Sequence, residues 1–204
     1  MAHAAKLALV DDSGVSTTDL LVNTGTPSFE GSAEPNSSVE LFASDGSTTE
    51  SLGTTIVDEN GDWSFTVAAG SELADGAYSI TVSSVPAGET DPTTSAAMEI
   101  TIDTIAPTIT SSANATALDE KTGADQVVYT ASTTDASAVR YSLKADNADD
   151  AEHFTIDSDS GEVTLSEDPD YAAHKSYRFT VIASDDAGNS SEQVVTLDLS
   201  LIHI

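Results

Sequence analysis

The sequence contains no cysteine and few basic or aromatic residues. Its 204 residues include 6 Lys and Arg, 5 Phe, 5 Tyr and 1 Trp. Without cysteine, disulfide bonds, thiolate metal sites and a cysteine nucleophile are excluded. No apolar run reaches the roughly 20 residues that a membrane-spanning helix needs, so we expect no direct membrane insertion.

Acidic residues dominate the charge. Asp and Glu number 35, which gives a formal charge of −29, and Lys6 is the only Lys or Arg before Asp103. Phosphate binding requires clustered basic side chains, so we expect neither nucleic acid nor an anionic membrane surface as a partner. Most of these carboxylates are explained by a solvated acidic surface that keeps a secreted or halophilic protein soluble. Charge of one sign repels itself in a compact state, and bound Ca²⁺ is the simplest ion that would neutralise the minority that cluster.

Short segments that alternate apolar and polar residues recur along the whole chain and predict β-strands. Turn-forming residues separate them. In the first half they cover 27–33, 39–43, 54–57, 63–67, 77–83 and 97–102, and in the second half 126–131, 139–143, 153–156, 162–165, 177–183 and 194–199.

The string TIDTIAP at 101–107 marks a boundary between two domains. Its Ile-x-Ile alternation ends a strand, and Pro107 prevents that strand from continuing. About a hundred residues lie on each side, a usual size for a β-sandwich. We therefore predict domains at 1–104 and 105–204, with the Asp103 carboxylate at the joint.

Two acidic turns are predicted to connect strands. The residues at 58–62, DENGD, accept positive φ and predict a tight hairpin leading to Trp63, which we expect in the core. The residues at 156–161, IDSDSG, predict a second hairpin. Asp157 and Asp159 resemble the start of an EF-hand loop, but the Glu at its twelfth position and the flanking helices are missing.

The first half resembles the bacterial Ig-like repeats of giant calcium-dependent adhesins of the RTX type. The resemblance is carried by LVDDSGVSTTD (9–19), GTPSFEGSAEPNSSVELF (25–42), LGTTIVDENGDWSFTV (52–67), ELADGAYSITV (72–82) and TIDTIAP. The second half is similar to a cadherin-type repeat, through GADQVVYTASTTD (123–135), VRYSL (139–143), HFTIDSDSGEVTL (153–165), DPDYAAHKSYRFTVIASDDAGN (168–189) and EQVVTLDL (192–199).

These resemblances imply an all-β fold of two tandem Ig-like and cadherin-like Greek-key β-sandwiches. They imply a structural extender segment of a cell-surface adhesin, stiffened by Ca²⁺ at the joint between domains and located outside the bacterial cell. Its partners are then the neighbouring tandem domains of the same chain. We expect the chain to be a fragment of a longer protein and to be monomeric as such.

The resemblance also implies which carboxylates bind Ca²⁺. Asp135 and Asp185 match cadherin ligands that follow strands at the end facing the preceding domain, and Asp103 points at the same joint. Glu120 and Asp170 match ligands at the opposite end, where Ala172 and Lys121 depart from the cadherin pattern. From the first domain we add Asp11, Asp12, Asp19 and Asp75 as further candidates. Six to eight oxygen ligands suit Ca²⁺ better than Mg²⁺ or Zn²⁺.

Two other functions were weighed. A module that binds carbohydrate or peptide would need an exposed aromatic platform or a groove, for which Tyr78, Tyr141 and Tyr171 are the residues to inspect. A hydrolase would need a catalytic site. His153 and His174 stand without a serine elbow or an H-E-x-x-H string, and we interpret them as surface residues. We predict that the chain is not an enzyme.

Overall fold

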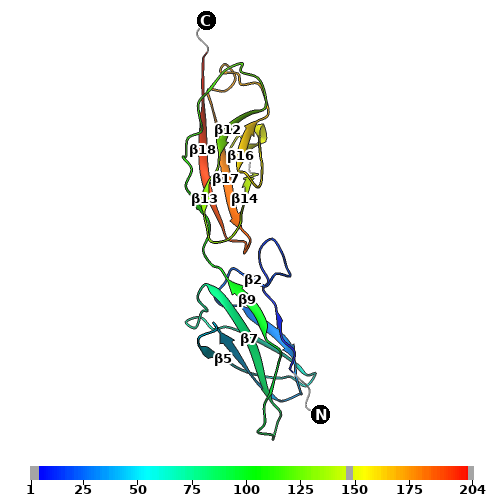
Figure 1. Ribbon diagram of the computed structural model, residues 1–204. Coiled ribbons are helices and arrows are strands. Elements are labelled where there is room, and N and C mark those ends of the chain that lie inside the picture. Colours follow the sequence, from blue (N-terminus) through cyan, green and yellow to red (C-terminus); the bar gives the residue numbers. More distant parts are fainter. Residues whose placement is uncertain (1–4, 146–148, 202–204) are drawn as a thin grey trace. The chain divides into compact units, whose positions relative to one another are not determined.

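The computed structural model describes residues 5–145 and 149–201 and divides the chain into two units, Met1–Ile105 (unit 1) and Ala106–Ile204 (unit 2). Figure 1 shows the strands of both units. Each unit contains its own cluster of buried apolar side chains. Among the described residues the only helix is the three-residue 3₁₀ turn η1 (Ala151–His153). The described part of the chain contains no helix long and apolar enough to cross a membrane. The predicted all-β fold with two sandwich domains in tandem is confirmed.

Unit 1 consists of two sheets. The smaller sheet has the order β1 (Ala8–Leu9), β3 (Ser28–Ser32), β6 (Asp62–Thr66). The larger sheet has the order β2 (Leu21–Val22), β9 (Met98–Ile102), β7 (Gly76–Val85), β4 (Ser38–Ser44), β5 (Thr49–Ile56), and β8 (Thr93–Thr94) pairs with β7. Side chains alternate across each strand, so that Val39, Leu41 and Ala43 of β4 are all buried.

The acidic turn at 58–62 forms, but the hairpin predicted around it is wrong. The Asp58 N–H donates to the Asp62 carbonyl (2.8 Å), and the Asp58 carboxylate accepts from the N–H groups of Asn60 and Asp62. However, β5 before the turn and β6 after it belong to different sheets. The turn therefore carries the chain from one sheet to the other. Trp63, directly after the turn, is buried in the core and is 4% exposed.

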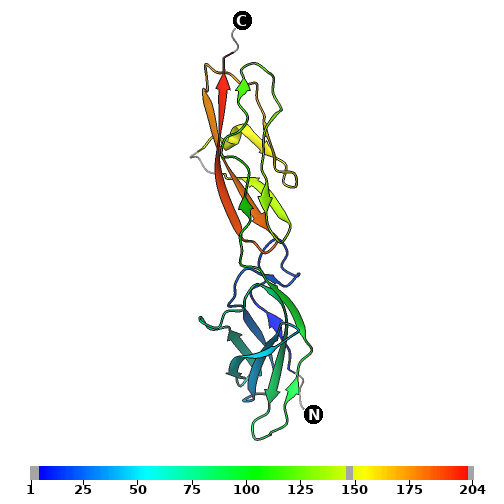
Figure 2. The same cartoon turned by 60° about the vertical axis from the view of Figure 1, so that its left-hand side comes forward.

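Unit 2 is built from three sets of paired strands. They have the orders β10 (Thr108–Ile109), β13 (Thr133–Thr134); β11 (Leu118–Asp119), β18 (Ser190–Ser200), β17 (Ser176–Asp185), β14 (Val139–Leu143); and β12 (Gln126–Thr130), β16 (Glu162–Leu165), β15 (Phe154–Ile156). The long strands β17 and β18, orange and red, run side by side in both views (Figure 1 and Figure 2).

The hairpin predicted at 156–161 is confirmed. β15 and β16 pair antiparallel across it, with Phe154 opposite Leu165. The Asp157 carboxylate accepts hydrogen bonds from the N–H groups of Asp159 (3.1 Å) and Ser160 (2.8 Å), so its role is to hold the turn.

Aromatic rings from three strands fill the core of unit 2. Phe179 of β17 is fully buried, and its ring centroid lies 4.6 Å from that of Phe154 and 5.9 Å from that of Tyr129. Such contacts combine large apolar area with favourable ring geometry. Because the buried clusters of the two units share no residue, we expect each unit to unfold as its own cooperative transition.

Replacing Phe179 by Ala should therefore destabilise unit 2 alone. Truncation of a buried Phe costs about 3–5 kcal/mol through lost burial and the cavity left behind. Trp63 is the only tryptophan and lies in unit 1, so its fluorescence reports unit 1. Every tyrosine except Tyr78 lies in unit 2, so tyrosine near-UV circular dichroism mainly follows unit 2 in urea. We expect the tyrosine transition to move to lower urea and the Trp63 transition to stay in place. Movement of both by the same amount would show a single cooperative unit.

Asp58 should make stability depend on pH in the acid range. Hydrogen bonds from backbone N–H groups hold the pKa of Asp58 below its ordinary value, and the bond from the Asp62 N–H has the largest effect. A carboxyl whose pKa is lower in the folded state stabilises that state above the unfolded pKa, and this contribution is lost as the pH falls through the folded pKa.

We therefore expect Asp58→Ala to lower the free energy of unfolding of unit 1 at neutral pH, and the difference from wild type to shrink below about pH 4. Urea titrations in EDTA, followed by Trp63 fluorescence, measure this. Glu59→Ala, which removes an exposed charge from the same turn, is the control and should show no such convergence. A pH-independent difference at Asp58 would contradict the assignment.

Candidate metal centre

Asp185 ends the long strand β17 and is 0% exposed. Its two carboxylate oxygens accept hydrogen bonds from the backbone N–H and the side-chain amide of Asn189, both at 2.8 Å. The Asp185 N–H in turn donates to the Asn189 carbonyl (3.0 Å), and Ala187 between them is fully buried. The loop after β17 thus holds a buried carboxylate in a fixed orientation. Both groups of Asn189 that donate to this carboxylate are neutral, so they do not balance its charge.

Asp135 follows β13 directly and is half-buried. One of its carboxylate oxygens accepts from the N–H (2.8 Å) and the hydroxyl (2.7 Å) of Ser137. This turn leads into β14, whose first residue, Val139, lies opposite Asp185 in the pairing with β17. The strand register therefore brings Asp135 and Asp185 to the same end of unit 2.

A carboxylate oxygen of Asp135 lies within 4.8 Å of one from Asp185. Two oxygens that bind one Ca²⁺ at 2.3–2.6 Å are separated by at most about 5 Å, so this spacing fits a shared ion. Two negative charges this close repel each other, and the cost is high when one of them is buried. Oxygen donors alone make the pair suitable for a hard cation.

In unit 1, Asp103 lies at the end of β9, where the chain leaves the sheet. Its N–H donates to the Val22 carbonyl (2.9 Å), and its carboxylate accepts from the Ile105 N–H (3.2 Å). Asp75 lies close by, because its carboxylate accepts from the N–H (3.0 Å) and hydroxyl (2.8 Å) of Thr104. Both carboxylates are thus at the end of unit 1 from which the chain continues.

The remaining candidates of unit 1 lie in and around the loop between β1 and β2. Asp11 accepts from the Ser28 N–H (3.1 Å) and Asp19 from the Leu21 N–H (3.2 Å), and both are exposed. The two carboxylate oxygens of Asp12 are buried and have no hydrogen-bond partner among the described residues. Among the described residues, the structure brings no three of the unit 1 candidates into one group with donor atoms within 4.8 Å of each other.

Glu120 and Asp170 lie on neighbouring segments of unit 2. The Lys121 N–H donates to the Pro169 carbonyl (2.8 Å), which joins the two loops directly beside these carboxylates. Asp170 uses one oxygen to accept from the Ala172 N–H (2.9 Å). In the described part of unit 2, they do not belong to any group of three close donors.

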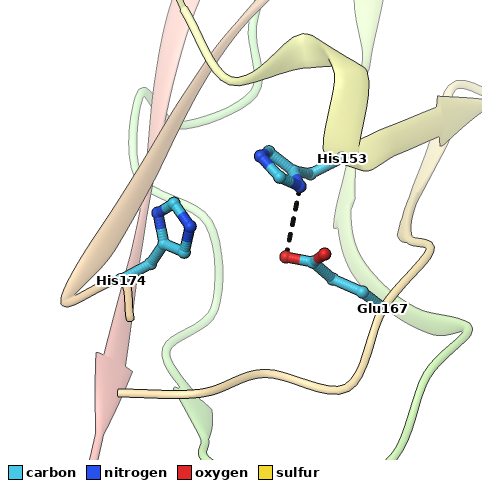
Figure 3. A group of neighbouring side chains, drawn as sticks. All are labelled: His153, Glu167 and His174. Carbon is cyan, nitrogen blue, oxygen red and sulfur yellow. Dashed lines mark ion pairs between the residues drawn. The ribbon is translucent and has the colours of Figure 1, made fainter. Parts of the chain in front are cut away.

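A different group of donors in unit 2 was not predicted from the sequence. Donor atoms of His153, Glu167 and His174 lie within 4.8 Å of one another (Figure 3), and all three side chains are half-buried. Both histidines, which we interpreted as surface residues, are thus only partly exposed. The Tyr177 hydroxyl donates to the Glu167 carboxylate (2.8 Å). This hydrogen bond is the main cause of the lowered pKa of Glu167. Burial is the main cause of the raised pKa of Tyr177.

The tyrosines considered as a ligand platform pack against the cores. Tyr78, Tyr141 and Tyr171 are half-buried, and the Tyr141 hydroxyl is within 2.8 Å of that of Thr133. The large apolar side chains that are exposed in the described part of the chain are all aliphatic. No observation on these residues favours a carbohydrate- or peptide-binding function.

Comparison with known families agrees with this architecture of two tandem β-sandwich domains. Residues 2–104 match the family described as bacterial Ig-like domain, and residues 106–202 match the cadherin domain family. The chain belongs to the bacterial Ig-like domain family over its first half, and a cadherin domain follows. The predicted order of a bacterial Ig-like domain followed by a cadherin domain is confirmed. No curated protein sequence matches the chain.

Several solved cadherin structures are similar to the chain. The third cadherin domain of human protocadherin 7 is 18% identical, with 48% of this chain and 87% of that chain covered and a TM-score of 0.42. Domains EC1-2 of human mucin-like protocadherin are 12% identical (96% and 98% covered, TM-score 0.42). Domains EC3-6 of protocadherin gammaB7 are 14% identical (TM-score 0.44); 97% of this chain is covered, which spans about half (51%) of that chain.

Proposed function

We propose that this chain is a calcium-stiffened structural segment of a bacterial cell-surface adhesin of the RTX type. The observation that carries the proposal is the convergence of Asp135 and Asp185, two carboxylates of which one is fully buried, at one end of unit 2. Bacterial Ig-like and cadherin domains are extracellular adhesion or structural modules, which supports the same conclusion. The neighbouring tandem domains are the partners, and the isolated chain is a monomer.

Covalent connectivity supports Asp103 as a third ligand of the same ion. Thr108 pairs with Thr134, so Asp135 lies level with Pro107, where unit 2 begins. Asp103 precedes Pro107 by only four residues, a length of chain that spans at most about 14 Å even when fully extended. This short connection allows Asp103 to reach the ion proposed at Asp135 and Asp185.

Further oxygen ligands would come from the other acidic residues. Ca²⁺ takes six to eight oxygens, so three carboxylates and water leave room for more. Asp12, with two buried oxygens that lack a hydrogen-bond partner, is the strongest of these in unit 1, ahead of Asp11, Asp19 and Asp75. Glu120 and Asp170 would contribute a second, weaker site at the other end of unit 2, where Ala172 replaces an expected carboxylate.

A shared ion explains how stiffness would arise. Without Ca²⁺ the segment 103–107 is a joint between two acidic units, and joints of this kind ordinarily permit motion. An ion bound by ligands from both units has its full affinity only in one relative orientation, and its binding energy therefore selects that orientation. Extracellular sites of this type bind Ca²⁺ with a Kd of about 0.1–1 mM, so the segment would be stiff outside cells.

Removal of Ca²⁺ should lower the stability of both units. Ligand binding to the folded state adds about 1.4 kcal/mol at ten times Kd and about 2.7 kcal/mol at a hundred times Kd. We expect unfolding temperatures in EDTA to fall by several degrees relative to millimolar Ca²⁺, with Mg²⁺ as the control that gives little protection. Superimposable melting curves in EDTA and Ca²⁺ would refute the proposed function.

Asp103→Ala tests whether the ion is shared. We expect Ca²⁺ to stop protecting unit 1, as followed by Trp63 fluorescence, while unit 2 keeps part of its response through Asp135 and Asp185. The distance distribution between one spin label in each unit should also stay broad in Ca²⁺. Asp91→Ala, which removes an exposed charge from another loop of unit 1, should behave like wild type. Unit 1 that remains protected in the Asp103 variant would show that the ion is not shared.

A further inference from the structure

Three donor side chains meet in unit 2, away from the Asp135 and Asp185 pair. His153 ends η1, Glu167 follows β16, and His174 precedes β17; Figure 3 shows the three side chains directed towards one another. Tyr177, which contacts this group, lies near one end of β17 and Asp185 lies at the other. At the rise of an extended strand the two ends are about 27 Å apart. The two groups are thus separate sites.

Backbone hydrogen bonds fix the positions from which these side chains project. The Ser166 N–H donates to the His153 carbonyl (2.9 Å), which extends the pairing of β15 with β16 and brings Glu167 beside His153. The His174 N–H donates to the Asp170 carbonyl (2.9 Å), which closes the turn that precedes β17. The three donors come from separate segments but rest on paired backbone, so little ordering is needed to bring them together.

Side-chain contacts hold the rings and the carboxylate in place. His153 Nδ1 is 3.2 Å from Glu167 Oε1, and the centroids of the two imidazole rings are 5.3 Å apart. The His174 ring stacks on the ring of Tyr177 at 4.8 Å and 20°. Tyr177 is 1% exposed, and its hydroxyl donates to Glu167, so one buried side chain orients two of the three donors.

The spacing suits a small divalent ion. Two ligands of a tetrahedral Zn²⁺ at 2.0–2.1 Å are about 3.3 Å apart, close to the separation of His153 and Glu167. Imidazole nitrogen favours Zn²⁺, Cu²⁺ and Ni²⁺, whereas Ca²⁺ takes oxygen ligands. Glu152 lies 3.7 Å from the other nitrogen of His153 and adds negative charge near the site. At 3.7 Å the Glu152 carboxylate is too far for a hydrogen bond to His153, and its side chain is 85% exposed, so we expect it to contribute only a screened charge.

We propose that His153, Glu167 and His174 bind one divalent transition-metal ion, with Zn²⁺ as the physiological candidate and water in the fourth position. The ion would join the hairpin of β15 and β16 to the loop before β17. The chain lacks cysteine, so no disulfide can make this connection. The site is independent of the Ca²⁺ proposed at the joint, since the donor set and the place in the fold both differ.

Isothermal titration of the full chain with ZnCl₂ tests this proposal. Millimolar Ca²⁺ in the buffer occupies carboxylate sites, so the remaining heat reports the imidazole site. We expect one equivalent of Zn²⁺ to bind, and Co²⁺ to bind with the visible absorption of tetrahedral coordination. Loss of an orienting partner lowers metal affinity by about 10- to 100-fold, and we expect Tyr177→Phe to show a loss in this range. Loss of a ligand should cost more, so we expect a larger decrease in Zn²⁺ affinity for each of His153→Ala, His174→Ala and Glu167→Gln.

The controls separate this site from other binding. Glu152→Gln and the double variant His3→Ala and His203→Ala keep the three donors and should bind Zn²⁺ with at most a small loss. Unchanged far-UV circular dichroism and unchanged Ca²⁺ protection of unit 2 in each variant show that the fold around the site is retained. Wild-type affinity in the double variant His153→Ala and His174→Ala, or loss of binding in the His3 and His203 variant, would overturn the proposal. In the second case the ion binds the terminal histidines.

Discussion

The packing of β17 is the constraint on which both candidate sites of unit 2 depend. Tyr177, Phe179, Val181 and Ala183 point into the core and are at most 1% exposed, which fixes this strand against its neighbours β14 and β18. Asp185 is the next residue in the same alternation and is therefore carried to a buried position at the end of the strand. At the other end Tyr177 orients Glu167. The two groups of metal donors thus occupy opposite ends of one buried strand.

The two sites differ in chemistry because they draw on different residues of an acidic chain. With 35 acidic side chains and no cysteine, oxygen donors are abundant, and their convergence at Asp135 and Asp185 suits a hard ion such as Ca²⁺. Imidazole is scarce, with 4 histidines in the chain, yet two of them meet beside Glu167. A single small domain therefore carries one group of oxygen donors and a second group that contains imidazole, and the two groups suit different classes of ion.

Much of the fold follows from local patterns in the sequence. Alternating apolar residues identify the longer strands of both units but miss the two-residue strands β1, β2, β8, β10, β11 and β13. The residues at 156–161 identify a hairpin whose turn is held by the Asp157 carboxylate. The turn at 58–62 was also recognisable, but its strands β5 and β6 belong to different sheets. Turn residues determine local backbone geometry, whereas strand partners are chosen by burial of side chains such as Trp63 that are distant in sequence.

By itself the sequence determined the all-β class, the tandem of an Ig-like and a cadherin domain, and Asp103, Asp135 and Asp185 as candidate ligands, since each follows from a local pattern or a family motif. The tertiary structure alone decided that His153, Glu167 and His174 meet. The spacing of these residues in the sequence matches no metal-binding motif. The register of β15 with β16 brings His153 beside Glu167, and Tyr177 orients both Glu167 and His174. The hairpin of β15 and β16 follows from a local pattern, but its packing against His174 and Tyr177 does not, and that packing completed the group.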